Sequence, residues 1–493
     1  SIQWMLLSRF ASRITTHLIR NMSDFKDKEM ALANDLVQFL TSSPSPYHCV
    51  QTSKAMLSRA GFVGISETNL KDWKNIQPNG KYYFTRNQST IVAFAVGGKW
   101  VPGNGFTAMG AHTDSPVFKI KPVSKTTGTG FLSIGVAPYG GGLWHTWFDR
   151  DLSIAGRVIV ANDDSSSFEH KLVNLIRPVL SIPNLAIHLT SGDERTSFKP
   201  NRETHFVPIL ASVVKAELAS PQPNTKADDE AKKVDTELNN HHPLLISLLA
   251  SELKCKPEDI RDFDLNLFDT NAPRIGGALD EFIYSARLDN QAMCFITLTS
   301  LINSCETLDN EQNIRLVALF DNEEIGSQSN RGADSRLLPS VFERLNGPET
   351  LDSALQKSIL ISADMAHGCH PNYAGKHEPN HKIGLHHGLV IKYNSQERYA
   401  TTGLSSFLLR EVARRHSIPV QQFSVRNDSP CGSTIGPMLS AHCGIRTVDC
   451  GVSQFAMHSI REMCGVADIL HSTDLLTHFF NDFSELDTKL SVD

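Results

Sequence analysis

Hydrophobic and polar positions divide the chain into two blocks of similar pattern with a different stretch between them. In the first block, apolar residues recur at helical spacing from Lys28 to Leu40, and three runs, Tyr82–Thr85, Thr90–Val96 and Phe106–Gly110, are typical of strands. From about Phe282 onward, strand-length apolar runs alternate with longer amphipathic stretches, the spacing of βαβ units. The strands predicted there are Ile314–Phe320, Ile359–Ser362, Leu389–Tyr393, Gln421–Val425 and Arg446–Val448, and the helices are Gln291–Cys305, Thr401–His416 and Gly465–Phe480. We therefore expect an α/β fold with a mostly parallel sheet flanked by helices.

The stretch between the two blocks predicts a β-rich insert. Short strand-like runs alternate there with clusters of Gly, Pro and Asp, which is typical of mostly antiparallel structure. These runs are Leu132–Val136, Ala155–Val160 and Leu185–Leu189. Polar Ser220–Asn240 predicts an exposed loop, and His242–Cys255 predicts an amphipathic helix. The expected division is an α/β domain formed by residues 22–115 and 273–493, interrupted by the insert at residues 116–272.

Length and composition limit the classes of protein that fit. A chain of 493 residues is too long for one compact core and predicts more than one domain. The net charge of −6 and the lack of a basic block argue against a nucleic-acid partner. No apolar run approaches the roughly 18 residues that span a bilayer, so we expect no membrane association. The nine cysteines are scattered without a CxxC pair, a usage that favours a reducing compartment and predicts a cytoplasmic protein.

The amino-terminal segment leaves a second location open. Residues 1–21 contain three arginines and no acidic residue, which is typical of a mitochondrial presequence. The chain does not begin with Met, so the segment could equally be an extension of the gene model. We expect Met22 to be the functional start, with mitochondrial import as the alternative.

Candidate metal-binding side chains follow several of the predicted strands. They are His112, Asp114, Asp321, Glu323, Glu324, Asp364, His367 and, shortly after another strand, His458. Ligands bind beyond the carboxyl ends of strands in open α/β sheets, so we expect these groups to converge. Histidines with paired carboxylates suit two divalent metals about 3.5–4 Å apart, and Zn²⁺, Mn²⁺ and Co²⁺ all accept this donor set. Adjacent Glu323 and Glu324 would supply one ligand and one general base.

Longer motifs carry a resemblance to a known family. They are GAHTDSP (110–116), GGLWHTWFDRDL (141–152), SARLDN (285–290), FDNEEIGS (320–327), SADMAHGCHPNY (362–373), CGSTIGP (431–437) and QFAMHSIRE (454–462). With these motifs the sequence closely resembles the aspartyl aminopeptidases, dinuclear metallopeptidases, from about Met22 to the carboxyl terminus. The resemblance implies a metallo-exopeptidase fold with an inserted dimerisation domain. It also implies an enzyme that releases N-terminal Asp, then Glu, from peptides by attack of a metal-activated water.

The resemblance assigns roles at the metals. One ion would bind His112, Asp289 and Asp364, and the other would bind Asp289, Glu324 and His458. Asp289 would bridge the two ions, most simply Zn²⁺, and a cis peptide would join it to Asn290. Glu323 would be the general base.

The resemblance also implies how substrate and subunits meet. The substrate-side residues would be His188, Glu323, Asp364, His367, Lys392 and Tyr399. Lys392 would attract the acidic side chain of the substrate. His188, in the insert, would act catalytically in the active site of a neighbouring subunit, because the family assembles as a dodecamer built from dimers.

Two kinds of alternative remain. Within the enzyme class, the chain could be a dinuclear aminopeptidase with glutamyl or leucyl preference, or a dinuclear deacylase. Outside it, a non-catalytic assembly or cargo protein could have kept the fold. Loss of a ligand or of the base would mark such a protein, and all of these residues are present.

Overall fold

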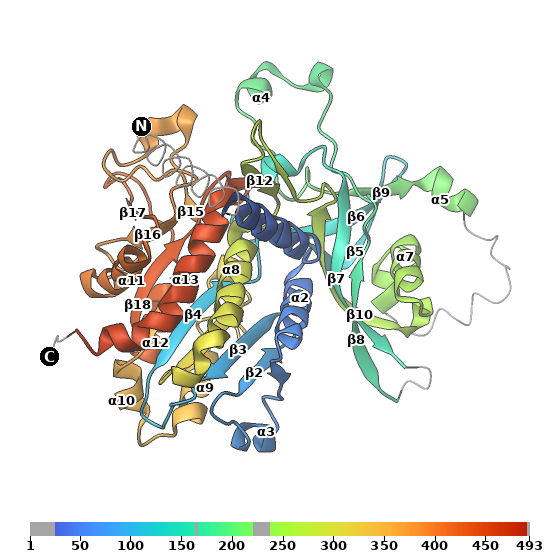
Figure 1. Ribbon diagram of the computed structural model, residues 1–493. Helices are drawn as coiled ribbons and strands as arrows, with labels where there is room; N and C mark the ends of the chain where they lie inside the picture. The colour runs from blue at the N-terminus through green and yellow to red at the C-terminus, as the bar shows by residue number, and fades with distance from the viewer. Residues whose placement is uncertain (1–24, 163–165, 220–236, 491–493) are drawn as a thin grey trace, which may run out of the picture.

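The computed structural model describes residues 25–162, 166–219 and 237–490, and these form three sheets (Figure 1). The predictions for residues 1–21 and for most of Ser220–Asn240 concern residues outside the described ranges. The largest sheet has nine strands, in the order β1 (Val63–Gly64), β2 (Lys81–Arg86), β3 (Thr90–Val96), β13 (Ile314–Phe320), β4 (Phe106–His112), β14 (Ile359–Ala363), β18 (Arg446–Gly451), β16 (Leu389–Tyr393) and β17 (Val420–Ser424). The four central strands β13, β4, β14 and β18 are parallel to one another, whereas β3 and β16 join them antiparallel. The predicted α/β fold is confirmed.

Helices cover both faces of this sheet. One face packs against a helix through residues 25–41 and against α2 (Pro46–Arg59), α8 (Leu288–Ser304), α11 (Gly403–His416) and α13 (Val466–Asp487). The other packs against α9 (Leu337–Asn346) and α12 (Ile435–Cys443). Along β4, Met109 and Ala111 face the first layer while Phe106 and Ala108 face the second. Burial on both faces explains the unbroken apolar runs and makes the strand ends a fixed base for polar side chains.

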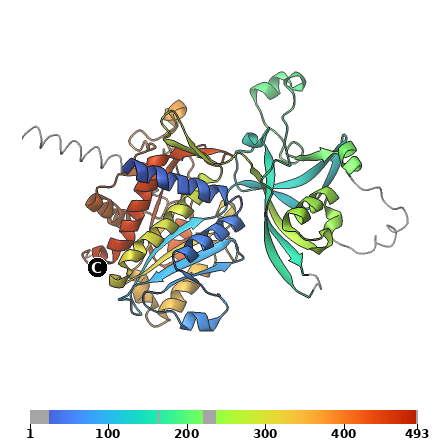
Figure 2. The same ribbon diagram turned by 45° about the vertical axis from the view of Figure 1, so that its right-hand side comes forward.

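The second sheet is antiparallel and lies beside the first (Figures 1 and 2). Its order is β8 (Phe168–Asn174), β7 (Leu152–Ala161), β10 (Ile260–Asp269), β5 (Val117–Gly128), β6 (Phe131–Tyr139) and β9 (Ile209–Ser212). Helix α7 (Pro243–Leu253) packs on it through Leu245 and Leu249. All six strands come from the stretch in which the sequence predicts a β-rich insert.

The third sheet gathers three of the sequence motifs. Its five strands are β11 (Arg274–Gly276), β12 (Phe282–Ser285), β20 (Glu462–Gly465), β19 (Ser453–Phe455) and β15 (Ala366–His367). Ser285 is the register partner of Glu462, and His367 that of Gln454. Segments far apart in sequence therefore meet at one end of the large sheet.

Short or irregular elements complete the described chain. The remaining helices are α3 (Leu70–Lys74), α4 (Gly192–Thr196), α5 (Val213–Ala219) and α10 (Leu351–Gln356), and the 3₁₀ turns are η1 (Trp144–Trp147), η2 (Ile187–Leu189), η3 (Glu237–Asn240), η4 (Pro257–Asp259), η5 (Cys305–Asn310), η6 (Glu323–Ile325) and η7 (Pro371–Lys376). The strand predicted at Leu185–Leu189 is wrong, because η2 occupies its end. Its alternating Leu185, Ile187 and Leu189 are 57–71% exposed, so they do not form the buried face of a strand.

A buried ion pair between Glu311 and Arg315 gives a test of this fold. Their side chains are 1% exposed, and Arg315 Nη2 lies 2.7 Å from Glu311 Oε2. Replacing Glu311 with Gln leaves a buried guanidinium without its counter-charge, which should lower the free energy of unfolding by about 3–5 kcal/mol in urea denaturation. As a control, Glu343→Gln breaks the exposed pair with Arg336 and should cost about 1 kcal/mol or less. Equal losses in the two variants would contradict the structural difference between the pairs.

Candidate metal centre

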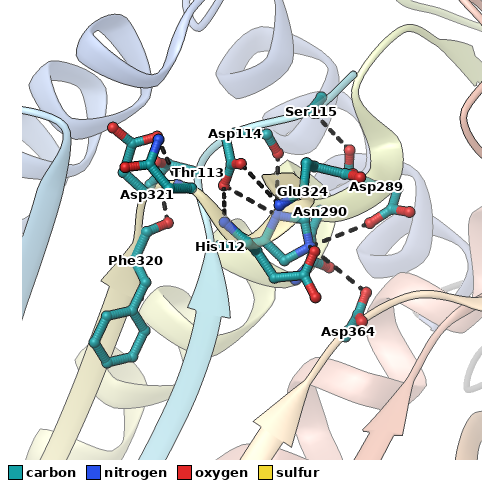
Figure 3. A network of polar contacts seen from close by, with 12 residues as sticks. His112, Thr113, Asp114, Ser115, Asp289, Asn290, Phe320, Asp321, Glu324 and Asp364 are labelled. Atoms are coloured by element: carbon teal, nitrogen blue, oxygen red, sulfur yellow. Dashed lines mark hydrogen bonds and ion pairs between the residues drawn. The ribbon is translucent and has the colours of Figure 1, made fainter. Parts of the chain in front are cut away.

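Parallel neighbouring strands bring the predicted ligands to one edge of the large sheet. His112 ends β4 and is the register partner of Phe320, which ends β13. Asp364 directly follows β14, the neighbour of β4 on its other side. Asp289 lies at the start of α8, in non-helical backbone, and a cis peptide joins it to Asn290 as the resemblance implies. Figure 3 shows the side chains of His112, Asp289 and Asp364 converging.

The ring of His112 points into a group of carboxylates. Its Nε2 atom lies 3.5 Å from Asp289 Oδ1, 3.7 Å from Asp364 Oδ1 and 3.8 Å from Glu323 Oε2. The residue is 1% exposed, so this group lies in a water-poor setting. Such an arrangement suits a divalent cation at the centre of the donors.

His458 approaches the same aspartate from the other side. Its Nε2 atom lies 3.3 Å from Asp289 Oδ2 and 3.5 Å from Glu324 Oε1. The two oxygens of Asp289 therefore face two different histidines. This is the placement that a bridging carboxylate needs.

Hydrogen bonds at the far side of each ring leave the inward nitrogens free to bind metal. His112 Nδ1 is 3.0 Å from the carbonyl oxygen of Asp114, and His458 Nδ1 is 2.9 Å from that of Gly141. A carbonyl oxygen only accepts, so the proton of each neutral ring lies on Nδ1. The lone pair then lies on Nε2, which is the usual arrangement for a metal-binding histidine.

The donors fit a metal in two further respects. Two buried oxygens, Asp289 Oδ1 and Glu324 Oε1, have no hydrogen-bond partner in the part of the chain that is described. Ligand atoms lie within 4.8 Å of one another in three groups, which are His112–Asp289–Asp364, His112–Glu323–Glu324 and Asp289–Glu324–His458. The first and third are the two ligand sets that the resemblance implies.

Burial and mutual repulsion shift the pKa values of the clustered side chains. Burial, opposed by the charge of His112 and reinforced by that of Asp364, raises the pKa of Glu323 to about 8. Burial and the charge of Asp289 raise the pKa of Glu324 well above its usual value. For His458, burial lowers the pKa, but the hydrogen bond to Asp289 and the charge of Glu324 outweigh it and raise the pKa to about 10. These shifts reflect the cost of gathering carboxylates in a buried volume, a cost that divalent ions bound among them would offset.

Asp114 and Asp321, two of the sequence candidates, have other roles. The carboxylate of Asp114 accepts hydrogen bonds from the backbone N–H of Glu323 and of Glu324, both at 3.1 Å, so it orients the Glu-Glu turn. Asp321 binds Arg331 Nε at 3.1 Å. Neither belongs to a ligand group among the residues that the structure covers.

Glu462 is a site residue that the sequence reasoning missed. It is 2% exposed, and its two oxygens accept hydrogen bonds from the backbone N–H of Asp289 at 3.0 Å and of His458 at 2.8 Å. It therefore ties the shared aspartate to a histidine from a distant segment. Its only signal in the sequence is its place at the end of the QFAMHSIRE motif.

Of the predicted substrate-side residues, Lys392 lies near both Asp364 and Tyr399. Lys392 is 3% exposed, and its Nζ atom lies 2.7 Å from the carbonyl oxygen of Met365 and 3.7 Å from Asp364 Oδ2. The same atom lies 5.5 Å from the ring centroid of Tyr399. The ring of His367 packs edge-on against Phe423, with centroids 4.8 Å apart.

His188 is the exception. It lies on the exposed η2 turn of the insert, and none of the three ligand groups found within the described chain contains it. The structure of one chain thus leaves His188 outside the cluster.

The fold and the cluster together define a class. A sheet covered by helices on both faces, with histidines and carboxylates at the carboxyl edge of its parallel strands, is the architecture of a metal-dependent exopeptidase. The sequence model of the Aminopeptidase I zinc metalloprotease (M18) family matches residues 39–480. The chain belongs to this family, which confirms the resemblance and the prediction of a metal-dependent hydrolase.

Known relatives and solved structures agree with this family assignment. The chain is 49% identical over 489 residues to a probable aspartyl aminopeptidase of Ricinus communis, covering 95% of this chain and 99% of the relative. It is 49% identical over 474 residues to the aspartyl aminopeptidase of Dictyostelium discoideum, covering 92% and 97%. It is also similar to a chain in the cryo-EM structure of the Ape4 and Nbr1 complex, with 43% identity, a TM-score of 0.89 and coverage of 94% and 88%. The mApe1 dodecamer of S. cerevisiae matches at 30% identity and a TM-score of 0.80, covering 93% and 98%.

In the part of the chain that the structure describes, every helix is too short or too polar to cross a membrane.

Proposed function

We propose that the chain is an aminopeptidase that releases acidic residues, Asp and then Glu, from peptide N-termini by two-metal activation of water. The identity of 49% to aspartyl aminopeptidases supports the acidic preference. The observation that carries the two-metal part is that the two carboxylate oxygens of Asp289 face different histidines. Oδ1 lies 3.5 Å from His112 Nε2, and Oδ2 lies 3.3 Å from His458 Nε2.

Each ion would have its own ligand set. His112 and Asp364 would complete the first with Asp289, and Glu324 and His458 would complete the second. The family description supports Zn²⁺, and the nitrogen and oxygen donors also accept Mn²⁺ or Co²⁺. Two divalent ions, when bound, acidify a water and polarise the scissile carbonyl.

Glu323 is our candidate for the general base, the group that transfers protons during the reaction. It lies within 3.8 Å of His112 Nε2, and its side chain is 15% exposed, so it faces the cluster and remains open to water and substrate. Glu324, its neighbour, has a 4% exposed side chain and faces His458. Glu323 would take a proton from the attacking water and return it to the leaving amine.

Lys392 is the candidate for recognition of the acidic side chain. An ammonium has three donors, and the carbonyl oxygen of Met365 takes one. A substrate carboxylate could take another in a pocket formed with Asp364, His367 and Tyr399. The competing role for Lys392 is to hold Asp364, 3.7 Å away.

His188 would act from a second copy of the chain. It lies between the exposed side chains of Ile187 and Leu189, which suit contact with another subunit. The neighbour solved as a dodecamer supports assembly of the same kind through the insert, over residues 116–272. His188 would then help to stabilise the oxyanion in the partner's active site.

We also propose a cytoplasmic location, which the nine free cysteines support.

Asp289→Asn tests the shared ligand. Loss of one negative oxygen that serves both ions should weaken both, by about 10-fold or more in metal titrations of the chelated protein. The matched control is Asp321→Asn, which alters a nearby buried aspartate bound to Arg331 and should keep wild-type metal content. Two ions per chain at unchanged affinity in Asp289→Asn would contradict the bridge.

Glu323→Gln tests the base. The amide keeps the size of the side chain but cannot accept the water's proton, so we expect turnover to fall by about 100- to 10,000-fold with full metal content. Glu324→Gln is the neighbouring control and should instead lose metal affinity. Near-normal turnover in Glu323→Gln rules out this residue as the base.

Lys392→Met tests specificity on a panel of Asp-, Glu- and Leu-terminated substrates. A charge-assisted hydrogen bond is worth about 1.5–3 kcal/mol, so kcat/KM for Asp substrates should fall by roughly 10- to 100-fold. Leu substrates should lose less, because they have no carboxylate to pair. An equal loss on all substrates would identify Lys392 as a support for Asp364, and a wild-type preference for Leu would overturn the acidic specificity itself.

A further inference from the structure

A turn of the inserted sheet reaches the metal cluster. It begins at Tyr139, the last residue of β6, and runs to Leu143. We call it the 139–143 turn. It supplies none of the candidate ligands, yet it bonds on one side to Asp114 and Asn322, which adjoin the Glu-Glu turn, and on the other side to His458. One contact supports the segment that carries Glu324, and the other holds His458, the two candidate ligands on the side of Asp289 Oδ2.

Tyr139 acts on the Glu-Glu turn through Asp114. Its hydroxyl donates to Asp114 Oδ2 at 2.7 Å and accepts from Asn322 Nδ2 at 2.9 Å. Asp114 in turn accepts the backbone N–H groups of Glu323 and Glu324. Tyr139 is 8% exposed, so water does not readily replace its hydroxyl. The hydroxyl therefore helps to fix the carboxylate on which the turn is held.

The backbone of the same turn fixes His458. The carbonyl oxygen of Gly141 accepts from Nδ1 of the ring at 2.9 Å, and the N–H of Leu143 donates to the carbonyl oxygen of His458 at 2.9 Å. Gly140 has φ +78°, and a Cβ atom there would lie 3.1 Å from Glu324 Cβ. The turn thus sets the direction of one ligand ring and lies directly against a second ligand.

We propose that the 139–143 turn is a positioning element of the metal centre, with Tyr139 as its positioning side chain. It holds Glu324 and His458 in the geometry that binds the ion they share with Asp289. This inference rests on the proposed two-metal function. It follows that the position of the inserted sheet controls metal affinity and turnover, so a partner that shifts this sheet alters the active site without touching a ligand.

Tyr139→Phe tests the side chain in the full-length protein. It removes one hydroxyl and keeps the ring. Affinity for the ion assigned to Asp289, Glu324 and His458 should fall by about 10- to 100-fold in Zn²⁺ titrations, and the absorption spectrum of bound Co²⁺ should change. The control is Tyr47→Phe, because Tyr47 in α2 is 6% exposed and its hydroxyl also bonds across to the inserted sheet, donating to Asp264 Oδ2 of β10 at 3.0 Å. That variant should keep wild-type affinity and spectrum.

Gly140→Ala tests the backbone of the turn. Its matched control is Gly130→Ala in the same sheet, where φ is +82° and an added Cβ would meet no atom within 4 Å. Both substitutions strain a left-handed backbone, but only Gly140→Ala presses on Glu324. We expect weaker metal binding in Gly140→Ala alone, with similar thermal unfolding of the two chelated variants.

The outcomes separate this proposal from the proposed function. Wild-type affinity and Co²⁺ spectra in both Tyr139→Phe and Gly140→Ala overturn the positioning role. Equal losses in each variant and its control also overturn it, because they show general loosening of the inserted sheet. A wild-type protein that binds a single ion contradicts the two-metal function, whereas selective loss of that ion's affinity in Tyr139→Phe would still support positioning.

Discussion

Mutual repulsion among buried carboxylates is the constraint on which this structure depends. Asp289, Glu323, Glu324 and Asp364 surround one small volume together with two histidines. Concentrating negative charge in a setting poor in water costs free energy, and protons or cations must offset it. The central parallel strands meet this constraint by fixing the donors at the ends of rigid, doubly covered elements. The carboxylates cannot move apart, so a cation binds to groups already in position.

A second layer of contacts converts this charged cluster into a defined geometry. Glu462 joins Asp289 to His458, and Asp114 holds the two glutamates by their backbone N–H groups. The carbonyl oxygen of Gly141 selects the tautomer of His458. Apart from the bond between His458 and nearby Glu462, these contacts join segments that are distant in sequence. The chemistry of the ligands therefore depends on the packing of the third sheet and of the insert as much as on the strands that carry them.

The sequence predicted the centre of the fold better than its edges. The strands Ile314–Phe320 and Leu389–Tyr393 were predicted with the bounds they have, because burial on both faces leaves an unbroken apolar run. The candidate ligands His112 and Asp364 could be proposed from the sequence because polar groups directly after such runs are unusual. The Leu185–Leu189 strand was wrong because alternation alone does not show whether one side is buried. Tyr139, Gly141 and Glu462 could not be found by periodicity, because their roles arise from tertiary contacts, one of them through a backbone carbonyl.

The wide separation of the ligands along the chain has a consequence for biosynthesis. His112 comes from the first block and His458 from near the carboxyl terminus, with Asp289 between them. Contacts of such high sequence separation form late in folding, after loop closure over most of the polypeptide. A nascent chain on the ribosome cannot complete the centre until its last helix-bearing segment has emerged. Only the finished polypeptide can therefore catalyse hydrolysis, and truncated translation products lack this activity.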